Sequence, residues 1–290
     1  MRVGFYQFQP IFGEKEKNLA KVCARLSKVE ADLMVLPELF ATGYLFRNRN
    51  ELACMAESIP SGMTTQALLA VSKTKKMFII GGIAEKVEGF ATKSLRHKVK
   101  NSSWCLGASV AKGKKIYNSA ILVCPNGKVH TYRKVHLFLE EKFLFTPGDK
   151  PFPVFDIGNI KIGMLICFDW IFPEASRILA LNGAQIICQP ANLILPYAHS
   201  ATLTRALENR VFIILCNRIG EDRRGKKRLK FNGMSQIVDP LGRIIFRASK
   251  DQETLKIVEI DPKQTLNKKV TEYNDVIKDR RPELYHKLIK

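Results

Sequence analysis

The chain has 290 residues, of which 46% are hydrophobic and 26% are charged. This length and balance are typical of a folded globular protein with one large domain or two small ones. No apolar run is long enough to span a bilayer, and the opening MRVGFYQFQP lacks the order of a signal peptide. We therefore expect a cytoplasmic protein with no membrane partner.

The formal net charge of +20 is the unusual feature of the composition. Much of the excess lies in residues 92–100 and 111–115, which together form a first basic cluster, and in a second cluster, RRGKKRLK, at residues 223–230. Basic clusters attract nucleic acid, but neither has the interleaved aromatic side chains typical of single-strand binding. We interpret both as solvated loops and expect no nucleic-acid partner. A scaffold that binds a polyanion remains the alternative.

The seven cysteines are widely spaced and include no CxxC pair. Neither a zinc site nor a redox motif is therefore indicated, and we expect no metal and no cofactor. Scattered cysteines in such a chain are mostly small buried apolar residues.

Short apolar segments alternate with amphipathic segments of helical period along the chain. The predicted strands cover residues 2–9, 32–39, 77–85, 116–124, 128–135, 160–167, 184–192, 211–217, 234–240, 243–249 and 254–260. The predicted helices cover residues 14–30, 64–75, 173–183 and 198–210, and a polar, extended tail begins at Asp261. This alternation predicts an α/β fold, and because no Gly-, Pro- or Ser-rich linker interrupts it, a single domain over residues 1–290.

Three predicted strands end in a reactive side chain. Glu38 follows the strand in VLPELF, Lys134 ends the strand in YRKVHLF, and Cys167 ends the strand in LICFD. Each residue alone is more often a chain returning to solvent. Together they can do nucleophilic chemistry: Cys167 attacks, Glu38 takes the thiol proton, and Lys134, with the backbone N–H of Phe168, stabilises an oxyanion.

A cysteine–histidine dyad is the alternative source of an activated thiol. The chain has five histidines, His97, His130, His136, His199 and His286, and none is near Cys167 in sequence. His136 lies two residues beyond Lys134, and we interpret it as orienting that loop rather than taking part in the chemistry.

The quoted segments resemble the nitrilase superfamily of carbon–nitrogen hydrolases. The matching segments are RVGFYQFQP, LPELFATGY, YRKVHLF, EEKFLFTPGD, ICFDWIFPEASR, QPANLILPYA, TRALENR and DRRPELY. They are spread over nearly the whole chain, and the order and spacing of the three central motifs are specific. The chain is most similar to the short, single-domain, amidase-like branch of the superfamily.

The resemblance implies a four-layer α-β-β-α sandwich and hydrolysis of a small amide or carbamoyl amine through a cysteine thioester, with release of ammonia. It assigns Glu38 as general base and later acid, Lys134 as oxyanion stabiliser and Cys167 as nucleophile. A second glutamate, Glu141 rather than Glu140, would position Lys134 and share in holding the protons of the site. The resemblance also implies a homodimer or higher homo-oligomer that pairs through helices, with the C-terminal tail reaching over the partner.

One segment departs from the pattern of the family. About two dozen extra residues, at about 89–114, separate the strand ending in IAEK from the strand beginning IYNSA. They contain the first basic cluster and Trp104, and they leave the three motifs intact.

The residues after Cys167 bear on the substrate. Relatives that act on carboxylate-bearing amides tend to have an arginine three or four positions beyond the cysteine, whereas this chain has Trp170 and Ile171. An apolar wall favours a neutral or amine-bearing amide, although Trp170 could equally be a packing residue. By family position, Tyr44, Phe168 and Asn192 also belong to the substrate pocket. The same triad serves nitrile hydrolysis, which stays open as an alternative.

Overall fold

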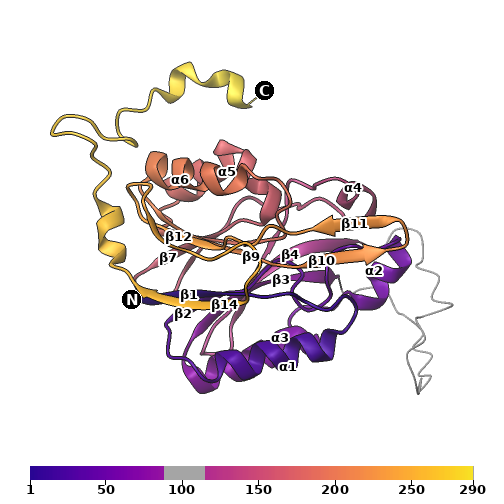
Figure 1. Ribbon diagram of the computed structural model, residues 1–290. Helices are drawn as coiled ribbons and strands as arrows, with labels where there is room; N and C mark the ends of the chain where they lie inside the picture. The colour runs from indigo at the N-terminus through magenta and orange to yellow at the C-terminus, as the bar shows by residue number, and fades with distance from the viewer. Residues whose placement is uncertain (88–114, 290) are drawn as a thin grey trace.

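Two six-stranded sheets packed face to face, with helices on both outer faces, form the body of the protein (Figure 1). The computed structural model describes residues 1–87 and 115–289. Its layers follow the order α-β-β-α, so the predicted four-layer sandwich is confirmed. The insertion at 89–114, with Trp104 and nearly all of the first basic cluster, lies outside the described residues.

The first sheet has three parallel strands at its centre, flanked by antiparallel ones. In spatial order its strands are β14 (Thr254–Glu259), β1 (Arg2–Gln7), β2 (Leu33–Val35), β3 (Phe78–Lys86), β4 (Ile116–Val123) and β5 (Val129–Arg133). The predicted hairpin joins β4 to β5, and Gly127 takes a positive φ of 87° in its turn.

The second sheet repeats this plan, with β7, β8 and β9 parallel and antiparallel strands outside them. In spatial order its strands are β13 (Ile244–Arg247), β12 (Gln236–Val238), β9 (Phe212–Asn217), β8 (Ile186–Ala191), β7 (Lys161–Met164) and β6 (Val154–Asp156). A separate hairpin is formed by β10 (Glu221–Arg224) and β11 (Lys227–Lys230).

Two helices lie on each outer face, and short helices follow several strands. The α-helices are α1 (Lys15–Leu26), α2 (Arg49–Met55), α3 (Met63–Lys75), α4 (Glu141–Leu144), α5 (Pro173–Leu181) and α6 (Ala198–Asn209). The 3-10 helices are η1 (Cys167–Ile171), η2 (Pro262–Leu266), η3 (Pro282–Leu284) and η4 (His286–Ile289). Helix α5 has Pro173 in its first turn, where the missing N–H has no intrahelical acceptor to lose.

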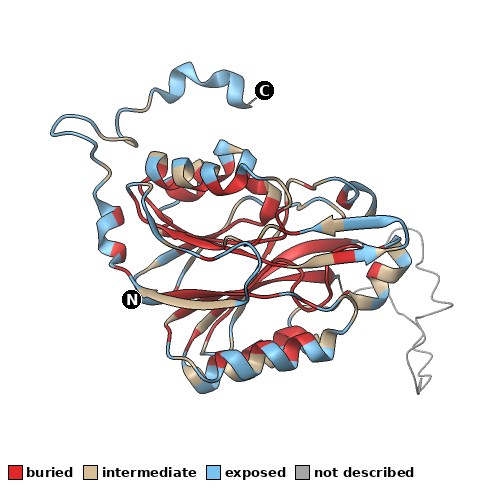
Figure 2. Ribbon diagram, in the orientation of Figure 1, coloured by how far each residue is buried: buried red, intermediate tan, exposed pale blue. Residues whose placement is uncertain are grey.

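Alternation along the strands builds three apolar layers, which appear as the red interior in Figure 2. Phe5 and Val35 face the second sheet and contribute to the core between the sheets, together with Ile186 and Ile214. The alternate residues of these strands face outward, toward the helices: Met34 packs under α1 and α3, and Ile187 packs under α5 and α6. Each central strand is thus buried on both faces, which explains its nearly continuous apolar sequence.

The structure corrects three sequence-based expectations. The second basic cluster does not form a loop, because residues 223–230 lie almost entirely in the hairpin β10–β11, whose strands pair and satisfy their backbone groups. The strand predicted at 160–167 pairs only over β7 and stops before Cys167. The tail after Asp261 includes three 3-10 helices, and its last part lies beyond α5 and α6 (Figure 1).

Within residues 1–87 and 115–289, no helix combines the length and apolar character needed to cross a membrane.

Gly82 lets strand β3 approach the segment that follows β2. A Cβ atom at this position would lie 2.5 Å from the Cα atom of Glu38 and 2.8 Å from the backbone nitrogen of Leu39. The Gly82 N–H donates to the Pro37 carbonyl at 3.1 Å, and the Gly82 carbonyl accepts from Phe40 at 3.3 Å. The position of the Glu38 backbone therefore depends on glycine at residue 82.

We predict that Gly82→Ala lowers the free energy of unfolding by about 1–3 kcal/mol, because the added methyl group overpacks against backbone that cannot yield. Urea unfolding followed by circular dichroism measures the change. Gly158→Asn is the control: residue 158 has a φ of +84°, which Asn tolerates, and nothing lies within 4 Å of a Cβ there. Equal stability of Gly82→Ala and the wild type would contradict the prediction.

Candidate active site

Three charged side chains meet inside the protein. The Lys134 Nζ atom lies 2.8 Å from Oε1 of Glu38 and 2.8 Å from Oε2 of Glu141. All three side chains are buried. We call Glu38, Lys134 and Glu141 the charge cluster; it unites two glutamates that lie far apart in the sequence around one ammonium group.

Each member of the charge cluster comes from the end or the beginning of an element. Glu38 follows β2, and Lys134 follows β5, where its backbone N–H donates to the Asn118 carbonyl of β4 at 2.8 Å. Glu141 is the first residue of α4. Its neighbour Glu140 is half exposed and pairs with Lys227 at 2.6 Å. The geometry therefore places Glu141, rather than Glu140, next to Lys134, as the sequence predicts.

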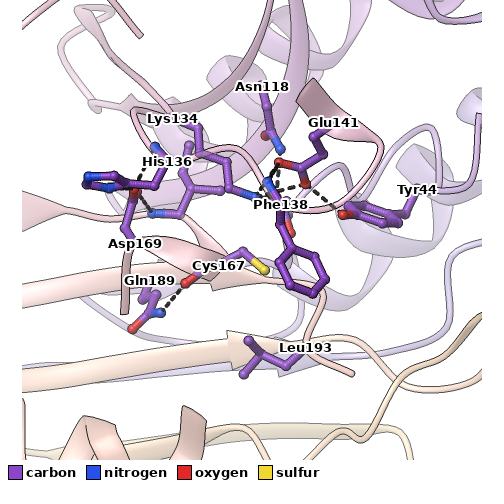
Figure 3. Close-up of polar contacts among 12 residues, drawn as sticks. Tyr44, Asn118, Lys134, His136, Phe138, Glu141, Cys167, Asp169, Gln189 and Leu193 are labelled. Carbon is purple, nitrogen blue, oxygen red and sulfur yellow. Dashed lines mark hydrogen bonds and ion pairs between the residues drawn. The ribbon is translucent and has the colours of Figure 1, made fainter. Parts of the chain in front are cut away.

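Neutral donors complete the charge cluster. The Asn118 amide donates to Glu38 Oε1 at 2.6 Å, and the Tyr44 hydroxyl donates to Glu141 Oε1 at 2.7 Å (Figure 3). The backbone N–H of Phe138 donates to Glu141 Oε2 at 3.0 Å. The other oxygen of Glu38, Oε2, is buried and has no hydrogen-bond partner in the described part of the chain. This oxygen is free to accept a proton from a substrate or a nucleophile.

Cys167 comes from the second sheet and faces the charge cluster from the opposite side (Figure 3). It begins η1, just beyond β7, with a φ of +43°, a left-handed conformation that non-glycine residues seldom adopt outside strained functional turns. Its carbonyl accepts from the Gln189 side chain of β8 at 2.9 Å. Cys167 is only 3% exposed, so the thiol is almost completely removed from bulk solvent.

The shared burial fixes the protonation states of the site. Burial raises the pKa of the Glu38 carboxyl, and the Lys134 ammonium only partly opposes this. Burial and the Glu38 carboxylate raise the pKa of the Cys167 thiol well above its usual range. The two carboxylates hold the pKa of Lys134 well above normal, despite its burial. The raised pKa values keep the Cys167 thiol protonated and make Glu38 a stronger base than an exposed carboxyl group, as general-base activation requires.

Asp169, which the sequence analysis missed, links the turn at Cys167 to the residues on either side of Lys134. Its Oδ2 accepts from the Tyr132 hydroxyl at 2.8 Å and from the Ile166 N–H at 2.9 Å. Its Oδ1 lies 2.8 Å from Nδ1 of His136 and accepts the His136 backbone N–H at 3.2 Å. The sequence did contain a signal for Asp169. A carboxylate two positions after a buried cysteine is itself expected to be buried, and a buried carboxylate needs hydrogen-bond donors.

The described histidines do not form a dyad with Cys167. His136 is held by Asp169 and stacks on Phe172, with ring centroids 3.6 Å apart, which supports its interpretation as a residue that orients the loop. His199 lies in α6 near the Gly233 carbonyl, and His130 packs on Phe155. His97 lies outside the described residues.

A small pocket opens on Cys167. Including its open mouth it measures about 210 Å³, and its lining residues in the described part of the chain carry no charge. The lining residues are Phe138, Cys167, Phe168, Trp170, Asn192, Leu193, Ile194 and Leu195. The pocket is therefore mainly aromatic and aliphatic.

Three of the four predicted substrate-binding residues, Phe168, Trp170 and Asn192, line this pocket. The fourth, Tyr44, does not line it and instead holds Glu141. Both polar atoms of the Asn192 side chain are buried without a partner in the described structure, so they can bind a ligand. The expectation that Ile171 forms part of the pocket wall is wrong: its side chain is 42% exposed, because η1 turns it away from the site.

Among the described residues, no group of three or more His, Cys, Asp or Glu side chains is arranged to hold a metal ion.

Comparisons with known proteins agree with this geometry. Residues 2–268 match the family model described as carbon-nitrogen hydrolase. A nitrilase from Pyrococcus abyssi (strain GE5 / Orsay) is 42% identical over 288 residues, which cover 98% of this chain and 99% of that protein. An (R)-stereoselective amidase from Pseudomonas sp. is 32% identical over 286 residues, covering 97% of this chain and 92% of the other.

A solved structure has the same fold. The crystal structure of an amidase from Nesterenkonia sp. matches with a TM-score of 0.73 at 24% identity, over 99% of this chain and 96% of that one. The match of the family model over nearly the whole chain, together with a 42% identical relative, settles the family. The chain is a member of the carbon-nitrogen hydrolase family of enzymes.

Proposed function

We propose that this enzyme hydrolyses the carbon–nitrogen bond of a small neutral amide or carbamoyl amine, releasing ammonia through a thioester on Cys167. The observation that carries the proposal is the unpartnered oxygen of Glu38. Oε1 is occupied by Lys134 and Asn118, whereas Oε2 is buried and unpaired in the described structure, beside a neutral thiol. Such an oxygen is suited to take a proton and return it.

In the first half-reaction, Glu38 takes the Cys167 proton as the sulfur attacks the substrate carbonyl carbon. The carbonyl oxygen gains negative charge, and the Lys134 ammonium stabilises it. Glu38 then gives its proton to the substrate nitrogen, the carbon–nitrogen bond breaks, and ammonia leaves. The product of this half-reaction is a thioester between the acyl group and Cys167.

In the second half-reaction, Glu38 takes a proton from water, whose oxygen attacks the thioester carbon. Lys134 again stabilises the oxyanion, the carbon–sulfur bond breaks, and the proton returns to the thiolate. A carboxylic acid leaves and Cys167 is restored. Glu141 takes no proton in this scheme; it holds Lys134, and Tyr44 holds Glu141.

The pocket supports a small, uncharged substrate. Its lining, within the described residues, carries no cation that could pair with a second carboxylate, and Lys134 already has two carboxylate partners. The Asn192 side chain offers one donor and one acceptor, which matches a substrate amide or carbamoyl group.

Nitrile hydrolysis is the second candidate, favoured by the 42% identity to the nitrilase from Pyrococcus abyssi. With the same base and ammonium group, the Cys167 thiol could add to the carbon atom of a nitrile, and water could then hydrolyse the adduct. Measuring ammonia release from matched alkyl amides, carbamoyl amines and nitriles separates the two functions. Turnover of nitriles but not of the amides would replace our proposal with this candidate.

A homodimer or higher homo-oligomer is part of the proposal. Apolar side chains on α5 and α6, among them Ile178, Leu181 and Leu207, are partly exposed on the outer face of the sandwich, where the resemblance implies pairing through helices. Light scattering coupled to size exclusion would measure the assembly. The cytoplasmic location stays a prediction from the sequence.

We predict that Cys167→Ala abolishes both turnover and the covalent adduct. Intact-mass spectrometry of the wild type quenched during turnover should show the mass of one acyl group, and the variant should show none. Cys188→Ala is the matched control, since Cys188 is buried in the core between the sheets, away from the pocket. Full ammonia release by Cys167→Ala would exclude the thioester mechanism.

The pH profile should report Glu38. The general base must be a carboxylate, so kcat/KM should fall as the pH drops through the Glu38 pKa, and burial places this limb above the ordinary value of about 4.5. No loss is expected between neutral pH and mildly alkaline pH, because the pKa values of Cys167 and Lys134 are both raised.

Glu38→Gln should lower kcat/KM by about a hundredfold or more and remove this acidic limb. The control is Glu140→Gln, which changes a half-exposed carboxylate near the site and should keep both the rate and the limb. An unchanged acidic limb in Glu38→Gln would assign the titration to another group.

Substrate preference tests the apolar pocket. We expect kcat/KM for a simple alkyl amide to exceed that for the ω-amide of a dicarboxylic acid of equal length by at least about tenfold, because burial of an unpaired carboxylate costs several kcal/mol. Leu195→Arg adds a cation at the pocket lining and should reduce the preference in kcat/KM for the alkyl amide over the ω-amide. Ile171→Arg places the same charge at an exposed position and should leave this preference unchanged. A wild-type preference for the ω-amide would contradict this reading.

A further inference from the structure

A buried ion pair at the base of the hairpin β10–β11 holds the backbone of Tyr44. The Arg218 guanidinium donates to both oxygens of Asp222, from Nη2 to Oδ1 at 2.9 Å and from Nη1 to Oδ2 at 3.1 Å. Asp222 Oδ2 also accepts the backbone N–H groups of Tyr44, at 2.9 Å, and of Leu45, at 3.1 Å. Both charged side chains are almost fully buried.

The same pair also holds the Tyr44 ring, through Phe231. The Arg218 guanidinium lies over the Phe231 ring, 4.1 Å from its centroid. Phe231 in turn meets the Tyr44 ring edge to face, with centroids 5.9 Å apart. Tyr44 is therefore fixed at its backbone and at its ring, which leaves the direction of its hydroxyl group little freedom.

The Tyr44 hydroxyl ends this chain of contacts at the charge cluster. It donates to Glu141 Oε1 at 2.7 Å, and the Lys134 ammonium donates to the same oxygen at 2.9 Å. Burial and the neighbouring carboxylates keep the pKa of Tyr44 well above its usual value, so the phenol stays a donor. A displacement of Tyr44 would therefore move Glu141 and, with it, the ammonium that Glu141 holds.

We propose that Asp222 is a positioning residue for the hydrolysis: paired with Arg218, it sets Tyr44, which sets Glu141 and hence the position of Lys134 at the oxyanion. The inference rests on the proposed function, because it assigns Lys134 to the oxyanion. It also gives the second basic cluster a role. Lys227 pairs with Glu140 at 2.6 Å, and Arg224 pairs with Glu51 of α2, so the hairpin is anchored both to α2 and to the residue that precedes α4.

The test is Asp222→Asn, which leaves the size of the side chain unchanged but removes the charge that faces Arg218. We expect kcat on a neutral amide to fall by about tenfold or more, with KM changed less than about threefold, because small displacements of catalytic groups cost rate rather than binding. Circular dichroism and thermal unfolding would establish that the variant is folded.

Asp239→Asn is the matched control. Asp239 also accepts two backbone N–H groups, from Leu241 and Arg243, and pairs with Arg243 at 2.7 Å. It lies beside Phe212, at the start of β9, whereas the pocket is at the end of β8. Its kcat should stay within about twofold of the wild type, since it shares no partner with Tyr44 in the described structure.

A double variant separates positioning from a general loss of structure. If Asp222 acts through the phenol, Asp222→Asn should cost less than about threefold when added to Tyr44→Phe. An unchanged kcat in Asp222→Asn, or the full loss in the Tyr44→Phe background, would overturn the proposal. Should Asp222→Asn not fold, Phe231→Leu takes its place: it keeps the ion pair, and it should lower kcat by about threefold or more in the wild type but not in Tyr44→Phe.

Alkylation of Cys167 by iodoacetamide tests the proposal without amide turnover. The rate depends on the charge cluster beside the thiol, so Asp222→Asn should slow it by about tenfold and Asp239→Asn should not. If the wild type hydrolyses none of the alkyl amides or carbamoyl amines, the proposed function is refuted but the positioning role of Asp222 is not. Equal alkylation rates in Asp222→Asn and the wild type would refute the positioning role.

Discussion

The burial of three ionised groups in one place is the constraint on which the rest of this structure depends. Taking a carboxylate or ammonium group out of water costs several kcal/mol, and only close partners in fixed positions offset it. Here one ammonium, that of Lys134, serves two carboxylates, Glu38 and Glu141, so the charge cluster carries an excess negative charge. Asn118 and Tyr44 stabilise the two carboxylates with neutral hydrogen bonds, but Oε2 of Glu38 receives no hydrogen bond from the described residues. Burial with this incomplete compensation raises the pKa of the Glu38 carboxyl, which is the property that our proposal requires of a general base.

Such a cluster needs a scaffold that fixes its members independently, and the two sheets provide it. Glu38 and Lys134 follow strands of the first sheet, whereas Cys167 follows β7 of the second. The distance between base and nucleophile is thus set by the apolar core between the sheets, which is far stiffer than a loop. Asp169 adds a direct polar link, because one carboxylate accepts from the nucleophile turn and from the Lys134 segment. The reacting groups sit at the carboxyl ends of strands, where α/β sheets commonly bind ligands.

The sequence predicts this architecture better than it predicts the contacts that hold the site. Strands such as β8 and β9 are almost continuously apolar because both faces are buried, so they stand out from the amphipathic helical segments. Glu38 and Lys134 stand out because a buried strand has no packing use for a charged side chain, whereas Cys167 stands out only together with them, since buried cysteines are common. The hydrogen-bond partners within the site cannot be recognised in this way. Asn118 is 80 positions from its partner Glu38, and Asp222 is 178 positions from its partner Tyr44. A hydrogen bond between such distant residues leaves no periodic signal, so the fold must be known before the partner can be found.

Backbone strain links the rate of the reaction to the stability of the whole molecule. Cys167 has a φ of +43°, and Leu39, next to Glu38, has a φ of +50°. A non-glycine residue in such a conformation costs about 1–3 kcal/mol and persists only where its surroundings leave no alternative. Glycine at residue 82 leaves room for the backbone of Glu38 and Leu39, and Asp169 accepts the N–H that precedes Cys167. A substitution that disturbs either contact should cost stability, as we predict for Gly82→Ala, and on our proposal it would also displace Glu38 or Cys167 from the substrate. The contacts that hold the strained backbone at Leu39 and Cys167 are therefore the same contacts that, on our proposal, position the base and the nucleophile.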